Sequence, residues 1–174
     1  MIDLNKLAEE IHAAAAEKGF WSVEDAEEKH IAKMHSELSE AVQADRAGIM
    51  YEVEHDGAKP EGVAAELTDF VMMAFDLLAW EGLKTVERFE EAVEEVLGDE
   101  ESLCEVREGT LPVLVNEMHA IVSRAVNDDE LYLLACAAVV VYMWLHARGY
   151  DLWQIIRAKM EYNKSRPALH GRAY

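Results

Sequence analysis

The stretch AELTDFVMMAFDLL, residues 65–78, decides the fold class of this chain. Its apolar side chains recur with helical spacing, and the helix predicted from them covers residues 63–80. At about 100° per residue, Glu66 points in the same direction as Phe70 and Met73, so a carboxylate lies on the apolar face. We therefore expect a buried helix that carries a charge on its core side.

Helical spacing continues on both sides of this segment, and no long stretch alternates with a period of two. The expected fold is all-α, a helical bundle that forms one domain over residues 1–174. The run LYLLACAAVVVYMWL, residues 131–145, suits a helix packed on all sides, since a membrane span needs about 20 apolar residues. The expected helices cover residues 3–18, Ser22 (as cap) to Gly48, 63–80, 85–97, 111–126, Asp128 or Asp129 (as cap) to Arg148, and Asp151 (as cap) to Asn163.

The amino-acid composition excludes some classes of binding partner and indicates where the protein acts. The formal net charge of −19 argues against partners that need a basic surface, which are nucleic acid backbones and anionic membranes. Cys104 and Cys136 are too few for a disulfide framework, and the N-terminus lacks a signal-peptide pattern, so we expect a cytoplasmic protein. An acidic chain still binds phosphorylated small molecules where a divalent cation bridges the like charges.

A second stretch, HSELSEAVQADRAG at residues 35–48, carries Glu37 and Glu40 three residues apart, as Glu66 and Asp69 are. That spacing places each pair on one helical face, and a shared interface would gather four negative groups. Burial of unpaired charge is costly, and Mg²⁺ or Mn²⁺, which prefer oxygen ligands, would offset the cost. The other explanation is an acidic helix face that is exposed to solvent. It suits Glu37 and Glu40 better than Glu66 and Asp69, because the latter two lie among apolar residues.

These motifs resemble a known family. The ExxE pair in HSELSEAVQADR followed by ExxD in KPEGVAAELTDFV resembles the MazG-like, all-α nucleoside triphosphate pyrophosphohydrolases. The segments EIHAAAAEKGFW and KMEYNKSRPALHG resemble the two ends of one branch of that family. The resemblance covers residues 1–83 and 148–172, and it assigns no role to the extra helical segment 84–147. It implies Mg²⁺-dependent cleavage of a nucleoside triphosphate to a monophosphate and pyrophosphate by a homodimer or homotetramer.

The resemblance also implies residue roles. Glu37, Glu40, Glu66 and Asp69 match the family's metal-binding acids, and Glu37 or Glu40 would orient or deprotonate the attacking water. The implied substrate-binding residues are Lys159, Asn163, Lys164, Arg166, Trp21 and His30. Without the resemblance, the basic residues among them would simply complement a helix C-terminus, and the two aromatic residues would suit core positions.

Two other classes of protein fit parts of the pattern. A ferritin-like di-iron or di-manganese bundle needs Glu-x-x-His on two helices, and Glu27 with His30 and Glu52 with His55 have that spacing. An acidic helical adaptor without enzymatic activity would carry its carboxylates only as surface.

The sequence also contains a weak internal similarity. LVNEMHAIVSRA, residues 114–125, resembles KMHSELSEAVQA, so that Glu117 would match Glu37. Residues of the second half without acidic groups would then replace the other three carboxylates; they are Ala120, Leu133 and Cys136. In that case the second half would be a degenerate copy that fills the place of a partner within one chain. The alternative is that any two amphipathic helix pairs look alike.

Overall fold

The computed structural model describes residues 3–55, 57–82, 108–128 and 130–171. The helices are α1 (Leu4–Glu17), α2 (Ala26–Ala47), α3 (Val63–Trp80), α6 (Leu111–Asn127), α7 (Leu133–Ala147), α8 (Leu152–Lys164) and the short 3-10 helix η1 (Ala168–Gly171). Within these described ranges the only β-type pairing is an isolated bridge between Glu52 and Glu61. The all-α prediction is therefore confirmed, and the helix expected at residues 85–97 lies outside the described residues.

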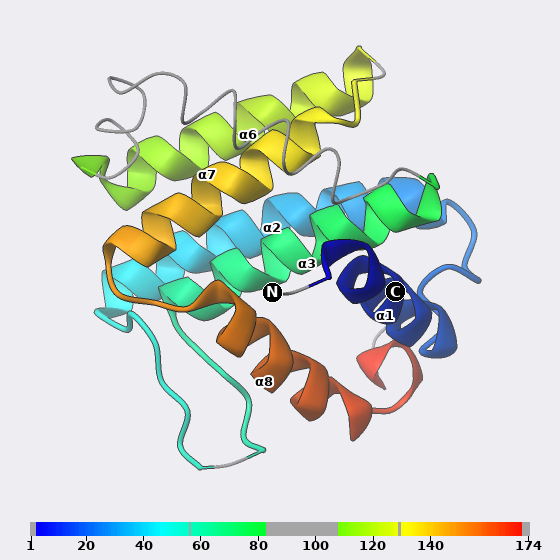
Figure 1. Ribbon diagram of the computed structural model, residues 1–174, viewed down its shortest axis with the longest axis horizontal. Coiled ribbons are helices and arrows are strands. Elements are labelled where there is room, and N and C mark those ends of the chain that lie inside the picture. The colour runs from blue at the N-terminus through cyan, green and yellow to red at the C-terminus, as the bar shows by residue number, and fades with distance from the viewer. Residues whose placement is uncertain (1–2, 56, 83–107, 129, 172–174) are drawn as a thin grey trace.

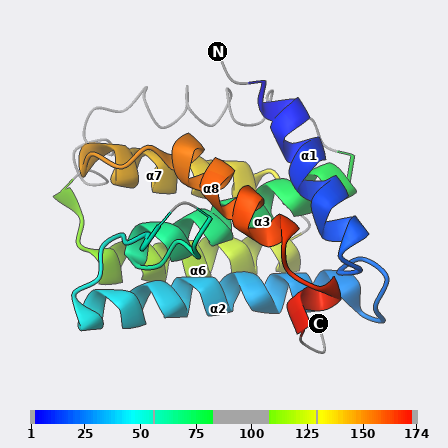
Figure 2. The same ribbon diagram turned by 90° about the horizontal axis from the view of Figure 1, so that it is seen from below.

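Four helices form the body of the molecule. α2, α3, α6 and α7 run side by side along its long axis, while α1 and α8 cross at one side (Figure 1). α2 packs on α3 and α6, and α7 packs on the same two helices, so two helix pairs face each other. The view from below shows α1 and the C-terminal segment meeting near the start of α2 (Figure 2).

α3 is the central helix because it contacts α1, α2, α7 and α8. Its apolar residues are almost all buried, with Phe70 and Phe75 fully enclosed, as the predicted burial of residues 63–80 requires. α7 is buried nearly as completely between α3 and α6, which confirms the bundle interpretation of the apolar run. No single helix in the described part of the chain is long and apolar enough to cross a membrane, and only α7 and α8 together, bent by 106°, pass that test.

The connection between α2 and α3 fixes where α3 begins. The backbone N–H groups of Val63 and Ala64 donate to the carbonyl oxygens of Ile49 (3.0 Å) and Met50 (2.9 Å), so residues just after α2 cap the N-terminus of α3. Gly62 has φ = +100°, and a Cβ atom there would lie 2.9 Å from both Ile49 O and Met50 O. Only glycine fits this close approach without strain. The first turn of α3 is thereby held beside the last turn of α2.

The predicted helix ends are confirmed at several positions and wrong at two. Asp151 caps α8 by accepting from the backbone N–H groups of Trp153 and Gln154, as expected. Ser22 does not cap α2, because residues 22–25 form turns and the helix begins only after Asp25, which has φ = +52°. Asp128 ends α6 rather than starting α7, whose N-cap is Tyr132. In both cases the residue type is one that commonly caps helices, but Ser22 lies in a turn and Asp128 ends the preceding helix.

Candidate metal centre and its cavity

Three carboxylates from α2 and α3 meet at the interface of these helices. Glu37, Glu40 and Glu66 each offer an oxygen atom, and the three atoms lie within 4.8 Å of one another. Glu37 and Glu66 are buried and Glu40 is half-buried. The capped start of α3 sets this geometry, since Glu66 lies in its first turn. Ser36 donates to the carboxylate of Glu40 at 2.9 Å and orients it.

The electrostatics of this triad are unfavourable without a cation. Burial raises the pKa of Glu66 to about 7, and the negative charges of Asp69 and Glu37 add to this. Burial and the charge of Asp69 likewise raise the pKa of Glu37. Each carboxylate thus resists ionisation because its surroundings are apolar and its neighbours are negative. A cation held by these three oxygen atoms would supply the missing positive charge.

Two lysines neutralise part of this charge. Lys33 pairs with Glu37 one helical turn away, and Lys159 of α8 donates to Asp69 at 2.6 Å. Lys159 is itself only 3% exposed, so its ammonium group is held at the site by this contact. Asp69, the fourth acid expected in the metal site, lies one turn beyond Glu66 and is engaged by Lys159 rather than included in the three-oxygen cluster.

A cavity of about 310 Å³ opens next to the triad. Its walls come from α1, α2, α3 and α8, together with the loop before α3 and the C-terminal segment. Lys33 and Asp69, which contact or neighbour the triad, line it. Glu37, Glu40 and Glu66 are not themselves among its lining residues, so the triad adjoins the cavity through Lys33 and Asp69. A volume of this size is appropriate for part or all of a small ligand.

The cavity gathers cations in a chain of net charge −19. Seven of the 16 lysines and arginines line it; they are Lys18, Lys29, Lys33, Lys59, Lys159, Lys164 and Arg166. The acidic residues that line it are Glu17, Asp69 and Asp76. Such a local excess of positive charge is the expected environment for an anionic ligand.

All four predicted phosphate-side residues line this cavity: Lys159, Asn163, Lys164 and Arg166. His30 lines it as well, while Trp21 does not. The indole ring of Trp21 stacks against Trp80, with ring centroids 4.5 Å apart, and against His30 at 4.9 Å. The half-buried ring of Phe20 also lines the cavity.

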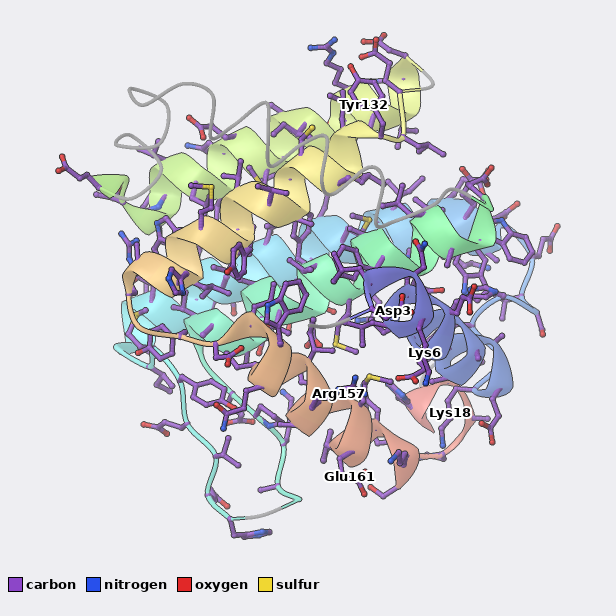
Figure 3. All side chains as sticks on the ribbon, viewed as in Figure 1. Asp3, Lys6, Lys18, Tyr132, Arg157 and Glu161 are labelled. Atoms are coloured by element: carbon purple, nitrogen blue, oxygen red, sulfur yellow. The ribbon has the colours of Figure 1, made fainter. Side chains whose placement is uncertain are left out.

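Sequence reasoning did not predict that Lys18 and His170 belong to this cavity. Lys18 at the end of α1 faces this segment (Figure 3) and donates to the backbone carbonyls of Lys164 (3.0 Å) and Arg166 (2.5 Å). His170 follows in η1 and lines the cavity beside these cations. Burial and the neighbouring positive charges, Arg166 foremost, lower the pKa of His170 to about 4. The only sequence signal was the basic tail itself, which does not show what lies opposite.

The described residues do not assemble the Glu-x-x-His ligands of a ferritin-like site. In the part of the chain that the structure describes, the one candidate metal cluster consists of glutamates alone. Nε2 of His30 lies 2.9 Å from the carbonyl oxygen of Met73, and His55 is exposed in the loop between α2 and α3. An all-oxygen ligand set favours a hard cation such as Mg²⁺ or Mn²⁺.

Comparison of the chain with protein-family models, with curated proteins and with solved structures finds no match.

Proposed function

We propose that this protein is a Mg²⁺-dependent nucleoside triphosphate pyrophosphohydrolase of the MazG-like type. The observation that carries the proposal is the juxtaposition of a buried all-carboxylate cluster with a cation-lined cavity in a strongly acidic chain. A metal-triphosphate complex has both parts that this arrangement fits, a hard cation for the carboxylates and phosphate oxygens for the lysines and Arg166.

The carboxylates supply the metal ligands in this proposal. Glu37, Glu40 and Glu66 would hold Mg²⁺ or Mn²⁺, and Asp69 would join them when its contact with Lys159 is exchanged. The bound cation supplies charge neutralisation on the phosphates and lowers the pKa of water. The protein's part is to bury the ligands, space them within 4.8 Å and present them beside the cavity.

The remaining residues position the substrate and move one proton. Lys159 and Arg166 are placed to bind phosphate oxygens, with Asn163 on the helical face of Lys159. Water attacks phosphorus, the bond between the α- and β-phosphates breaks, and pyrophosphate leaves with the electron pair of that bond. A carboxylate of the triad, Glu40 or Glu37, accepts the proton of the water. Nucleoside triphosphate and water thus yield monophosphate and pyrophosphate.

Pyrophosphate release from a panel of nucleoside triphosphates tests the proposal. We expect release with Mg²⁺ or Mn²⁺ that stops in EDTA. Glu66→Gln should lower kcat/KM by about 100-fold or more, since it removes a charged ligand and keeps the side-chain shape. Glu117→Gln is the matched control, because it removes the same charge from an exposed position on α6. Full activity of Glu66→Gln would refute the metal assignment. If no nucleoside triphosphate yields pyrophosphate, the result would favour an acidic helical adaptor without enzymatic activity.

We further propose that the second half of the chain replaces a partner subunit. The α2–α3 pair faces the α6–α7 pair, and His35 of α2 meets His119 of α6 with stacked rings and Nδ1 atoms 2.7 Å apart. Both histidines follow a buried methionine and precede, by four residues, a serine that bonds back to their carbonyl oxygen. Such matched contacts suit a degenerate repeat, in a register that pairs Glu37 with Ile121 rather than with Glu117 as the sequence comparison had it. An active monomer in solution would support this arrangement, whereas an obligate dimer or tetramer with shared sites would contradict it.

A further inference from the structure

The end of the cavity away from the metal centre is built around a buried aspartate. Asp76 lies two helical turns after Asp69 on α3, about 10 Å further along the axis, and both line the cavity. Its side chain is 4% exposed. The mechanism above uses Asp69 but gives Asp76 no role.

One oxygen of Asp76 is fully occupied by the protein. Oδ1 accepts from Nδ1 of His12 at 2.7 Å and from the indole N–H of Trp21 at 2.9 Å. Trp21 is in turn fixed by its stacking on Trp80 and His30. The carboxylate plane is therefore held in one orientation, and its second oxygen, Oδ2, points away from these donors.

Oδ2 and a nitrogen of His30 face one another without a hydrogen bond between them. His30 donates from Nε2 to the carbonyl oxygen of Met73 at 2.9 Å, which leaves Nδ1 as the acceptor atom of the neutral ring. This Nδ1 lies 3.8 Å from Oδ2, beyond hydrogen-bond distance. No residue in the described ranges donates a hydrogen bond to either atom. Every side-chain nitrogen or oxygen without a partner in this part of the chain is accessible to solvent, and Asp76 and His30 both line the cavity, so Oδ2 is open to it.

The charge states agree with this geometry. Burial lowers the pKa of His30, so its ring is neutral near pH 7. Burial raises the pKa of Asp76, and the hydrogen bonds that Oδ1 accepts from His12 and Trp21 oppose that rise and favour the carboxylate. The cavity end therefore presents two hydrogen-bond acceptors and no side-chain donor between them. The side chains of Met72 and Met73, which neighbour Asp76 on α3, supply apolar walls.

We propose that Asp76 and His30 bind the exocyclic amino group of a nucleobase, so that cytosine and adenine nucleotides are preferred over their oxo counterparts. This proposal rests on the proposed function. An amino group offers two N–H donors to two acceptors, whereas a carbonyl oxygen would turn its lone pairs toward a carboxylate. A buried acceptor left unpaired in this way costs binding free energy, and sites built on such hydrogen bonds discriminate strongly.

Two substrate pairs test the amino group. dCTP differs from dUTP, and dATP from dITP, by an amino group in place of an oxo group, and the adjacent ring nitrogen is an acceptor in the amino member and an N–H donor in the oxo member. We expect kcat/KM to favour the amino member of each pair by about tenfold or more. Asp76→Asn should reduce or reverse that ratio, because Oδ1 must still accept from His12 and Trp21 and the new amide nitrogen would then face the base. Asp45→Asn, an exposed position on α2, is the matched control and should leave the ratio unchanged.

Binding of dCMP and dUMP by calorimetry in EDTA separates this inference from the proposed function. Tighter binding of dCMP without any pyrophosphate release would uphold the base site and refute the catalytic proposal. Pyrophosphate release with equal kcat/KM for both members of each pair, or with an oxo preference, would overturn the inference and leave the catalytic proposal standing. The wild-type comparison is decisive even where Asp76→Asn fails to fold. Failure of both monophosphates to bind would also overturn it.

Discussion

Replacing Glu66 by glutamine should stabilise the metal-free protein at alkaline pH. Burial, together with the charges of Asp69 and Glu37, raises the pKa of Glu66 to about 7 from 4.5. A raised pKa means that the folded state binds the proton more tightly than the unfolded chain does. The contribution to stability is complete below pH 4.5, declines as the pH rises, and is lost above about pH 7. Glutamine cannot ionise, so the variant escapes this loss.

The magnitude follows from the same values. The interval between 4.5 and about 7 corresponds to about 3 kcal/mol at 1.36 kcal/mol per pH unit. Local relaxation and sharing of the charge with Glu37 reduce this, so we expect Glu66→Gln to raise the free energy of unfolding by about 1–3 kcal/mol at pH 8 in EDTA. At pH 5 most of the difference should disappear, because Glu66 is then protonated in the folded wild-type protein.

Urea unfolding followed by circular dichroism at pH 5 and pH 8 measures this difference. Repeating the titrations with Mg²⁺ or Mn²⁺ should cancel or reverse the difference, because the wild-type protein gains about 2.7 kcal/mol at a cation concentration 100 times the Kd and the variant gains little. Glu117→Gln corrects for the general effect of removing one negative charge from a chain of net charge −19. A variant that is less stable than wild type at pH 8 in EDTA, or that keeps the full cation-dependent gain, would refute the reasoning.

Two further predictions concern the contacts around this site. Lys159→Met should lower the free energy of unfolding by about 2 kcal/mol in EDTA, because Asp69 loses its buried partner. It should also weaken inhibition by pyrophosphate, because the cavity loses a cation. Arg157 is exposed on the same helix, and the control variant Arg157→Met should show neither effect. Burial lowers the pKa of His35 and of His119, so their contribution to stability is present above pH 6.5 and is lost as the pH falls below it. His119→Asn should therefore lose less stability than wild type between pH 7 and pH 5 in urea titrations, and an unchanged pH dependence would contradict this assignment.

The elements that the sequence predicted well are those with strong local signals. The apolar spacing of residues 63–80 and the cap at Asp151 depend only on nearby residues, and both are confirmed. The start of α7 was wrong because Asp128 and Asp129 have cap composition, while the chain makes another turn before Tyr132 begins the helix. Local composition does not distinguish a cap from a turn residue when both are followed by an apolar run.

The candidate site was predictable only in part for a similar reason. Spacing placed Glu37, Glu40 and Glu66 on helix faces that could meet, and the structure brings them together. Spacing could not show that Lys159 reaches Asp69 across 90 residues of sequence, since that contact depends on how α8 crosses α3. His30 was expected to bind substrate, but its approach to Asp76 could not be predicted, because it depends on how α2 packs on α3.

The two lysine contacts link the metal centre to the cavity. Lys33 and Lys159 both line the cavity and both bond a carboxylate of the acidic set, Glu37 and Asp69 respectively. In the proposed function, a cation bound to these carboxylates takes over the neutralising role of the lysines. Each ammonium group is then free to turn toward a phosphate oxygen, which lowers the cost of binding the triphosphate. By thermodynamic linkage the triphosphate must strengthen cation binding by the same factor. Under the proposed function, the ion pairs of Lys33 and Lys159 would thus be the source of cooperative assembly of the metal-nucleotide complex.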